Sequence, residues 1–144
     1  MSLKIGPLTV DPPIVLAPMA GVTDAPFRGV CSRFGAGLYV SEMITARALV
    51  ERNERTLSML RFDGSEATRS VQLYGTDPRT LGEAVRFLVN EVGVDHVDMN
   101  FGCPVPKVTR KGGGSALPVR TRLLRDIVRG AVAAAGEVPV TIKF

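Results

Sequence analysis

The chain has 144 residues, 45% of them hydrophobic, which is enough material for one buried core and predicts a single domain over residues 1–144. Two separated cysteines and a single histidine argue against a disulfide framework and against a metal centre. The formal net charge of +4 favours a polyanionic partner such as a nucleic acid.

The N-terminal segment, residues 1–13, has neither the long apolar stretch nor the cleavage site of a signal peptide. No later run reaches the roughly 20 apolar residues that a membrane-spanning helix needs. We therefore expect a soluble cytoplasmic protein with no membrane partner. Two short apolar stretches around Gly6-Pro7 predict a small hairpin or turn.

A buried strand is predicted within IVLAPM, residues 14–19, because this apolar run has the length of a strand and follows two prolines. A helix should follow, capped by Thr23 or Asp24 and ended by Gly35. Its apolar residues recur on one face and place Cys31 in the core. This face comprises Phe27, Val30, Cys31 and Phe34.

The second predicted strand, residues 38–40, leads through residues 41–43 into a helical stretch at residues 46–50. Residues 61–67 are polar and predict a loop. Residues 70–74 then predict the third strand, which Gly75 closes.

The clearest predicted helix begins after Asp77, which can cap it, and has Pro78 in its first position and Gly93 at its end. Its apolar stripe comprises Leu81, Ala84, Val85, Leu88 and Val92. Residues 96–100 predict the fourth strand. A further helix at about residues 121–135 and a fifth strand at 138–144 complete the chain.

This alternation of apolar strands and helices predicts an α/β fold with a parallel sheet covered by helices on at least one face. Two architectures fit the alternation, namely an open doubly wound sheet and a (β/α)₈ barrel. In both, ligands bind beyond the carboxyl ends of the strands.

The segments that follow the strands are unusual in composition. The small residues of APMAG, 17–21, let the backbone approach a planar ligand closely, and no GxGxxG or P-loop motif is present. Cys103 lies in a polar turn, where its thiol is either packed or able to act as an acid. Residues 104–125 contain six basic and no acidic side chains, either an ordinary solvated surface or a patch for a polyanion.

Four segments of the chain, VLAPMAGVTDAPFR, SVQLYG, DMNFGCPVPKVTRKGGGSAL and VTIKF, occur in the order found in bacterial tRNA-dihydrouridine synthases. The sequence therefore resembles the N-terminal part of that family. The resemblance implies an oxidoreductase with a (β/α)₈ TIM barrel, FMN as cofactor, NADPH as reductant and uridine in tRNA as substrate.

The resemblance also assigns roles to individual residues. The backbone of Pro18, Met19 and Ala20 would surround the flavin ring, the Gln72 amide would bond to the ring, and Lys143 would stabilise negative charge at its N1 and O2 edge.

For the substrate, Asn100 would hold the uracil edge and Cys103 would donate a proton to C5 as C6 receives hydride. Lys107, Arg110 and Lys111 would meet tRNA phosphates. A turn-forming role for Asn100 is the alternative. Two weaker candidates are Glu42 and Arg47.

A complete barrel usually needs about 250 residues, whereas this chain supplies about five strands, without the later strands and the helical tRNA-binding domain of the family. We therefore expect weak FMN binding and self-association, or association with a complementing fragment. The alternatives are another FMN barrel acting on a small pyrimidine or enone, and a noncatalytic RNA-binding remnant.

Overall fold

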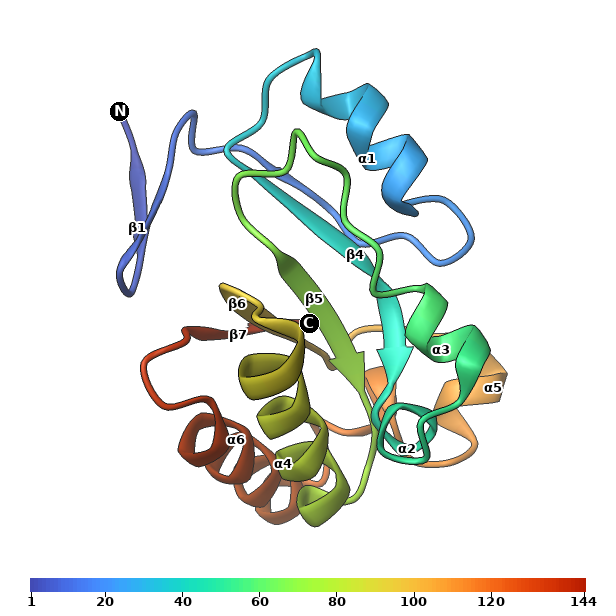
Figure 1. Cartoon of the computed structure of the whole chain (residues 1–144). Coiled ribbons are helices and arrows are strands. Elements are labelled where there is room, and N and C mark those ends of the chain that lie inside the picture. Colours follow the sequence, from blue (N-terminus) through green and yellow to red (C-terminus); the bar gives the residue numbers. More distant parts are fainter.

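The computed structural model describes residues 1–144, which form a five-stranded parallel sheet, flanking helices and a separate two-stranded ribbon (Figure 1). The strands of the sheet lie side by side in chain order, without the reversal of order that defines a doubly wound sheet. The sheet therefore forms the curved first part of a (β/α)₈ barrel. Its strands are β3 (Val15–Leu16), β4 (Leu38–Thr45), β5 (Ser70–Tyr74), β6 (His96–Asn100) and β7 (Val140–Lys143).

The N-terminal ribbon confirms the predicted hairpin. Strands β1 (Leu3–Ile5) and β2 (Leu8–Val10) pair antiparallel across a turn at Gly6, whose positive φ of 56° glycine adopts without strain. No helix of the chain is long and apolar enough to cross a membrane.

The main core lies between the outer face of the sheet and two helices that contact each other, α4 (Pro78–Phe87) and α6 (Thr121–Ala135) (Figure 1). The predicted stripe of α4 is confirmed, because Leu81, Ala84 and Val85 are fully buried. As predicted, Asp77 caps α4 by accepting the Thr80 N–H. A π-helical turn, η1 (Leu88–Val92), extends α4 to Gly93, which takes the left-handed conformation that ends it.

Shorter helices fill the remaining connections. They are α2 (Ala46–Val50), α3 (Glu54–Ser58), α5 (Pro106–Thr109) and the 3₁₀ turn η2 (Gly114–Ala116). The basic segment after β6 therefore contains two helical turns. Strand β4 is longer than predicted, because residues 41–45 belong to it; its pairing with β5 shifts register between Val40 and Met43.

The first helix, α1 (Ala25–Ser32), corrects a prediction. Val30 is 53% exposed, Phe34 beyond the helix end is 84% exposed, and Cys31 is only partly buried. The fully buried side chain is Arg28, whose guanidinium donates to both carboxylate oxygens of Glu66 at 2.7 and 3.0 Å. The prediction from apolar spacing, that the face with Val30, Cys31 and Phe34 is buried, was therefore wrong. A buried ion pair between Arg28 and Glu66 instead anchors this helix to the 61–67 segment.

Candidate active site at the carboxyl rim

The sequence-predicted site residues other than Gln72 lie at or beyond one rim of the sheet, because parallel strands place all their carboxyl ends at the same edge. Pro18, Met19 and Ala20 follow β3, and Gln72 lies within β5. The remaining predicted contacts lie in or beyond the last two strands. Asn100 ends β6, Cys103 follows it, and Lys143 ends β7.

The turn after β3 is held in place through its backbone. Thr23, fully buried, accepts the Met19 N–H at 3.0 Å, and the Met19 carbonyl accepts the N–H groups of Val22 and Thr23. The Glu42 carboxylate accepts the N–H of Gly21 and so ties the turn to β4. Glu42, a weak candidate from the sequence, therefore has a structural role here.

The side-chain amides of Gln72 and Asn100 are linked directly. Asn100 Nδ2 donates to Gln72 Oε1 at 2.9 Å, and Gln72 Nε2 donates to Asp98 Oδ2 at 2.6 Å. Asn100 Oδ1 accepts the backbone N–H groups of Cys103 at 2.9 Å and Gly102 at 3.3 Å. Asn100 therefore has the turn-forming role that the sequence left open, and it uses its acceptor oxygen for that role.

Cys103 is held on both sides of its backbone. Its carbonyl accepts the N–H of Ser115 at 3.0 Å, while its own N–H is donated to Asn100. Gly114, with a positive φ of 55°, lies against the same carbonyl so closely that a Cβ atom would collide with it. The glycine segment after β6 is therefore packed against the Cys103 turn, which leaves the thiol half-buried.

One cavity of about 310 Å³ brings together residues from both ends of the sheet. Pro18 from the turn after β3 and Lys143 from β7 both line it, together with His96, Asp98 and Thr141 on the inner face. Two of the predicted flavin contacts, Pro18 and Lys143, therefore border one cavity. Gln72 does not line this cavity but donates a hydrogen bond to Asp98, which does.

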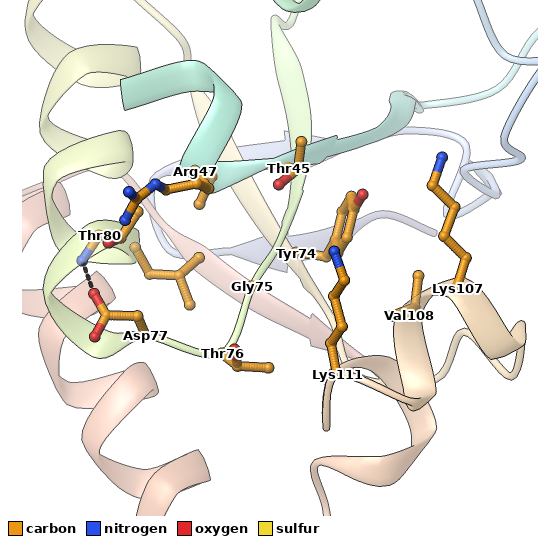
Figure 2. Close-up of a pocket in the computed structure, with 13 residues that line it drawn as sticks. Thr45, Arg47, Tyr74, Gly75, Thr76, Asp77, Thr80, Lys107, Val108 and Lys111 are labelled. Carbon is orange, nitrogen blue, oxygen red and sulfur yellow. Dashed lines mark hydrogen bonds between the residues drawn. The ribbon is translucent and has the colours of Figure 1, made fainter. Parts of the chain in front are cut away.

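A second cavity, of about 340 Å³, lies beside the rim between α2, the loop after β5 and α5 (Figure 2). Lys107 and Lys111 line one side, and Arg47 lines the other. Arg110 does not line the cavity. The one acidic side chain that lines the cavity is Asp77. It accepts hydrogen bonds from Thr80, and these bonds lower the pKa of the Asp77 carboxyl.

The inner face of the sheet also carries polar residues that sequence reasoning missed. His96 Nδ1 is 2.7 Å from Ser70 Oγ, His96 Nε2 is 3.0 Å from Thr141 Oγ1, and Thr141 Oγ1 is 2.6 Å from Asp98 Oδ1. Burial lowers the pKa of His96, and the Asp98 charge opposes this effect. The available signal was the polar-apolar alternation of residues 96–100.

No group of three or more histidine, cysteine or acidic side chains is arranged to hold a metal ion. The groups at the rim and just below it on the inner face are instead a thiol, two carboxamides, a carboxylate and an ammonium group. Such a set can orient a polar heterocycle, transfer a proton and stabilise an anion.

Comparison with known proteins identifies the family. The family model of dihydrouridine synthases (Dus) matches residues 15–144. A probable tRNA-dihydrouridine synthase of Mycobacterium tuberculosis is 52% identical over 152 residues, covering 99% of this chain and 39% of the relative. Another of Mycobacterium leprae is 47% identical, covering 90% of this chain and 41% of the relative.

A third relative, tRNA-dihydrouridine synthase B of Pseudomonas aeruginosa, is 45% identical over 142 residues, covering 99% of this chain and 42% of the relative. The chain thus spans about two fifths of the length of these curated relatives. Since the family model covers nearly all of the chain, the chain belongs to the dihydrouridine synthase family.

Proposed function

We propose that the chain supplies the N-terminal part of an FMN-dependent enzyme that reduces the C5–C6 bond of uridine in tRNA, with NADPH as reductant. The observation that carries this proposal is the placement of Pro18, Cys103 and Lys143 at or beyond the carboxyl ends of β3, β6 and β7, with Asn100 hydrogen-bonded both to Gln72 and to the Cys103 turn. Membership of the family supports it, since the relatives are named for tRNA dihydrouridine synthesis.

The residues around the 310 Å³ cavity fit a flavin. Ala17 and Pro18 at the start of the turn offer backbone and small side chains to a flat ring, and Lys143 offers a cation at the opposite border; Met19 and Ala20 follow outside the cavity lining. FMN, when bound, supplies the hydride. Lys143 would stabilise the negative charge that reduction places on the ring edge. A bond from Gln72 to the ring would use its second amide N–H, since the first is donated to Asp98.

Cys103 and Asn100 would act on the uracil. Cys103 donates the Sγ proton to C5 while C6 receives the hydride, so the double bond gains two hydrogens and the thiol becomes a thiolate. Asn100 retains one weakly engaged amide N–H, which faces Met43 Sδ at 3.6 Å. This N–H would donate to a uracil carbonyl, because Oδ1 is already engaged by Gly102 and Cys103.

The basic cavity beside the rim would bind the RNA backbone. Lys107, Lys111 and Arg47 line a space large enough for a phosphodiester, next to the Cys103 turn (Figure 2). Arg110, outside that cavity, would contribute only at longer range. Each cation that neutralises a phosphate releases counterions, so binding should weaken steeply as salt increases.

The test of the chemistry is Cys103→Ala in the native enzyme. We expect reduction of FMN by NADPH to persist, while dihydrouridine formation on unmodified tRNA falls by about a hundredfold or more. The matched control is Cys31→Ala, which removes the other thiol, on α1. Mass spectrometry of the tRNA reports the product. Equal turnover by the Cys103 variant would remove this thiol from the mechanism.

The test of the RNA contact is the salt dependence of tRNA affinity. Lys107→Gln and Lys111→Gln should each lower the slope of log affinity against log salt by about 1. Arg86→Gln is the control, because Arg86 lies in the last turn of α4, away from the basic cavity. No affinity for tRNA, combined with turnover of a free pyrimidine, would favour the small-molecule alternative.

We also infer that the 144-residue chain alone binds FMN weakly and self-associates. The sheet leaves β3 and β7 unpaired on their outer sides, and Val15 and Phe144 beside these edges are 41% and 70% exposed. Size-exclusion chromatography with flavin absorbance tests this inference. A stable yellow monomer would contradict it.

A further inference from the structure

A buried carboxylate at the centre of the inner face has no cationic partner. Asp98 is 5% exposed and forms no ion pair with any lysine or arginine of the chain. Its two oxygens accept hydrogen bonds from Gln72 Nε2 and Thr141 Oγ1, each at 2.6 Å. These hydrogen bonds replace the solvation that burial removes.

The carboxylate determines where the protons lie on one side of the network. An ionised carboxylate only accepts, so Thr141 donates its one hydroxyl proton to Asp98. Thr141 Oγ1 must then accept from Nε2 of His96. Burial lowers the pKa of His96 and so favours the neutral ring, in which Nδ1 accepts from Ser70.

The same carboxylate determines the amide orientations on the other side. A reversed Gln72 amide would place Oε1 against an oxygen of Asp98 at 2.6 Å, which is repulsive. Gln72 Oε1 therefore faces Asn100 and accepts from Nδ2, and Asn100 Oδ1 must face the N–H groups of Gly102 and Cys103.

We propose that Asp98 is a positioning residue, whose charge sets the direction of the hydrogen bonds through Gln72 and Asn100 and so fixes the Cys103 turn. The proposal deepens the proposed function, on which it rests for the role of the thiol. The geometric claim itself needs neither flavin nor RNA, since every group in it belongs to this chain.

The primary test is Asp98→Asn in the native enzyme, without tRNA, followed by amide hydrogen exchange measured by NMR. An asparagine amide can donate to or accept from Gln72, so the reversed orientation of Gln72 becomes accessible; it places Nε2 against Asn100 Nδ2 and removes the acceptor that holds the Asn100 amide. We expect the Cys103 amide to exchange about tenfold faster, relative to the Met99 amide within β6. The ratio cancels a general loss of stability, which would accelerate both amides.

A double variant, Asp98→Asn with Gln72→Glu, exchanges the carboxylate and the carboxamide between the two positions. The carboxamide introduced at position 98 would donate to the carboxylate introduced at position 72. That carboxylate would again accept from Asn100 and restore the original orientation of its amide. The exchange ratio should return to within about threefold of the unmodified chain, a coupling that independent structural losses do not produce. If the ratio of the double variant is altered as much as that of Asp98→Asn, the proposal is overturned.

The matched control is Thr141→Val, which removes the other hydrogen bond to Asp98 but leaves the Gln72 and Asn100 link intact. This variant should leave the Cys103 to Met99 ratio within about twofold of the original. A change as large as that of Asp98→Asn would show that loss of packing, and not direction, controls the turn, and would refute the proposal.

A failure of Asp98→Asn to fold is also informative. If Asp98→Asn alone is unfolded, the double variant must still fold and show the original ratio, and an unfolded double variant counts against the proposal. Because the exchange measurement needs no cofactor or tRNA, its outcome is separate from that of the Cys103→Ala activity test. An unchanged ratio in Asp98→Asn would refute positioning while leaving the proposed reaction untouched.

Discussion

The two faces of the central strands β5 and β6 are both buried but are stabilised in different ways. On the outer face, Val71 and Leu73 of β5 and Val97 and Met99 of β6 are fully buried against α4 and α6. On the inner face, four alternate residues of the same strands are polar and at most 5% exposed, namely Ser70, Gln72, His96 and Asp98.

This contrast separates two sources of stability. The outer face gains free energy in proportion to the apolar area removed from water, so the volume and fit of each side chain determine its contribution. The inner face gains little from area and depends on pairing every donor with an acceptor; no buried side-chain nitrogen or oxygen lacks a partner. Side-chain volume thus matters most on one face and hydrogen-bond direction on the other.

The difference between the faces also has a functional consequence. The outer face holds the helices that support the strands, whereas the inner face leads directly to Asn100 and the Cys103 turn. A polar inner face can transmit orientation to the rim, because hydrogen bonds are directional and apolar contacts are not. Substitutions on each face test this division.

The largest expected effect is on the outer face. Leu73→Ala removes a fully buried side chain and should lower the free energy of unfolding by about 2–5 kcal/mol. Leu73→Met nearly conserves volume and should cost less than about 1.5 kcal/mol. Urea denaturation measures both. Equal costs for the two variants would mean that packing volume does not control this face.

An intermediate effect is expected on the inner face. Ser70→Ala removes few atoms but leaves Nδ1 of the buried His96 without its donor, which should cost about 1–3 kcal/mol. Ser58→Ala is the control, since Ser58 is exposed on α3 and its loss should change stability by less than about 0.5 kcal/mol. If thermal unfolding gives similar losses of stability for Ser70→Ala and Ser58→Ala, the buried hydrogen bonds of the inner face contribute no more than an exposed one.

The smallest expected effect is a pH dependence confined to the inner face. His96 is the only histidine, and burial lowers its pKa below the usual 6.5, so the unfolded chain binds a proton that the folded chain refuses. Stability should therefore fall as pH decreases from about 7 to 5. Urea midpoints across this range measure the dependence.

His96→Gln should abolish most of this dependence between about pH 5 and 7. The pKa values of Asp63 and Asp77 are lowered by hydrogen bonds with Ser65 and Thr80, so their stabilising effect is lost only at more acidic pH. If His96→Gln keeps the full dependence of stability on pH, groups other than His96 cause it.

The elements with strong local signals could be predicted closely from the sequence. Strand β6 occupies residues 96–100 and helix α6 residues 121–135, as their patterns indicated. Asp77 and Gly93 mark the two ends of the helical segment through capping and a left-handed turn. Such signals act between near neighbours in the chain, so one sequence suffices to find them.

The elements decided by distant contacts could not be predicted in this way. Arg28 is buried because Glu66, 38 residues away, accepts from it, while the apolar side of α1 has no sheet face to cover it. Likewise, nothing local indicates that His96 meets Thr141 or that Asp98 meets Gln72, at separations of 45 and 26 residues.

The sequence by itself determined the succession of strands and helices and the residues that follow each strand, because propensity, periodicity and capping are local properties. The tertiary structure decided which of those residues meet. Only the parallel alignment of strands sets the Cys103 turn, Asn100, Gln72 and Asp98 in one hydrogen-bonded series, since cross-strand register is fixed by the packing of the whole sheet.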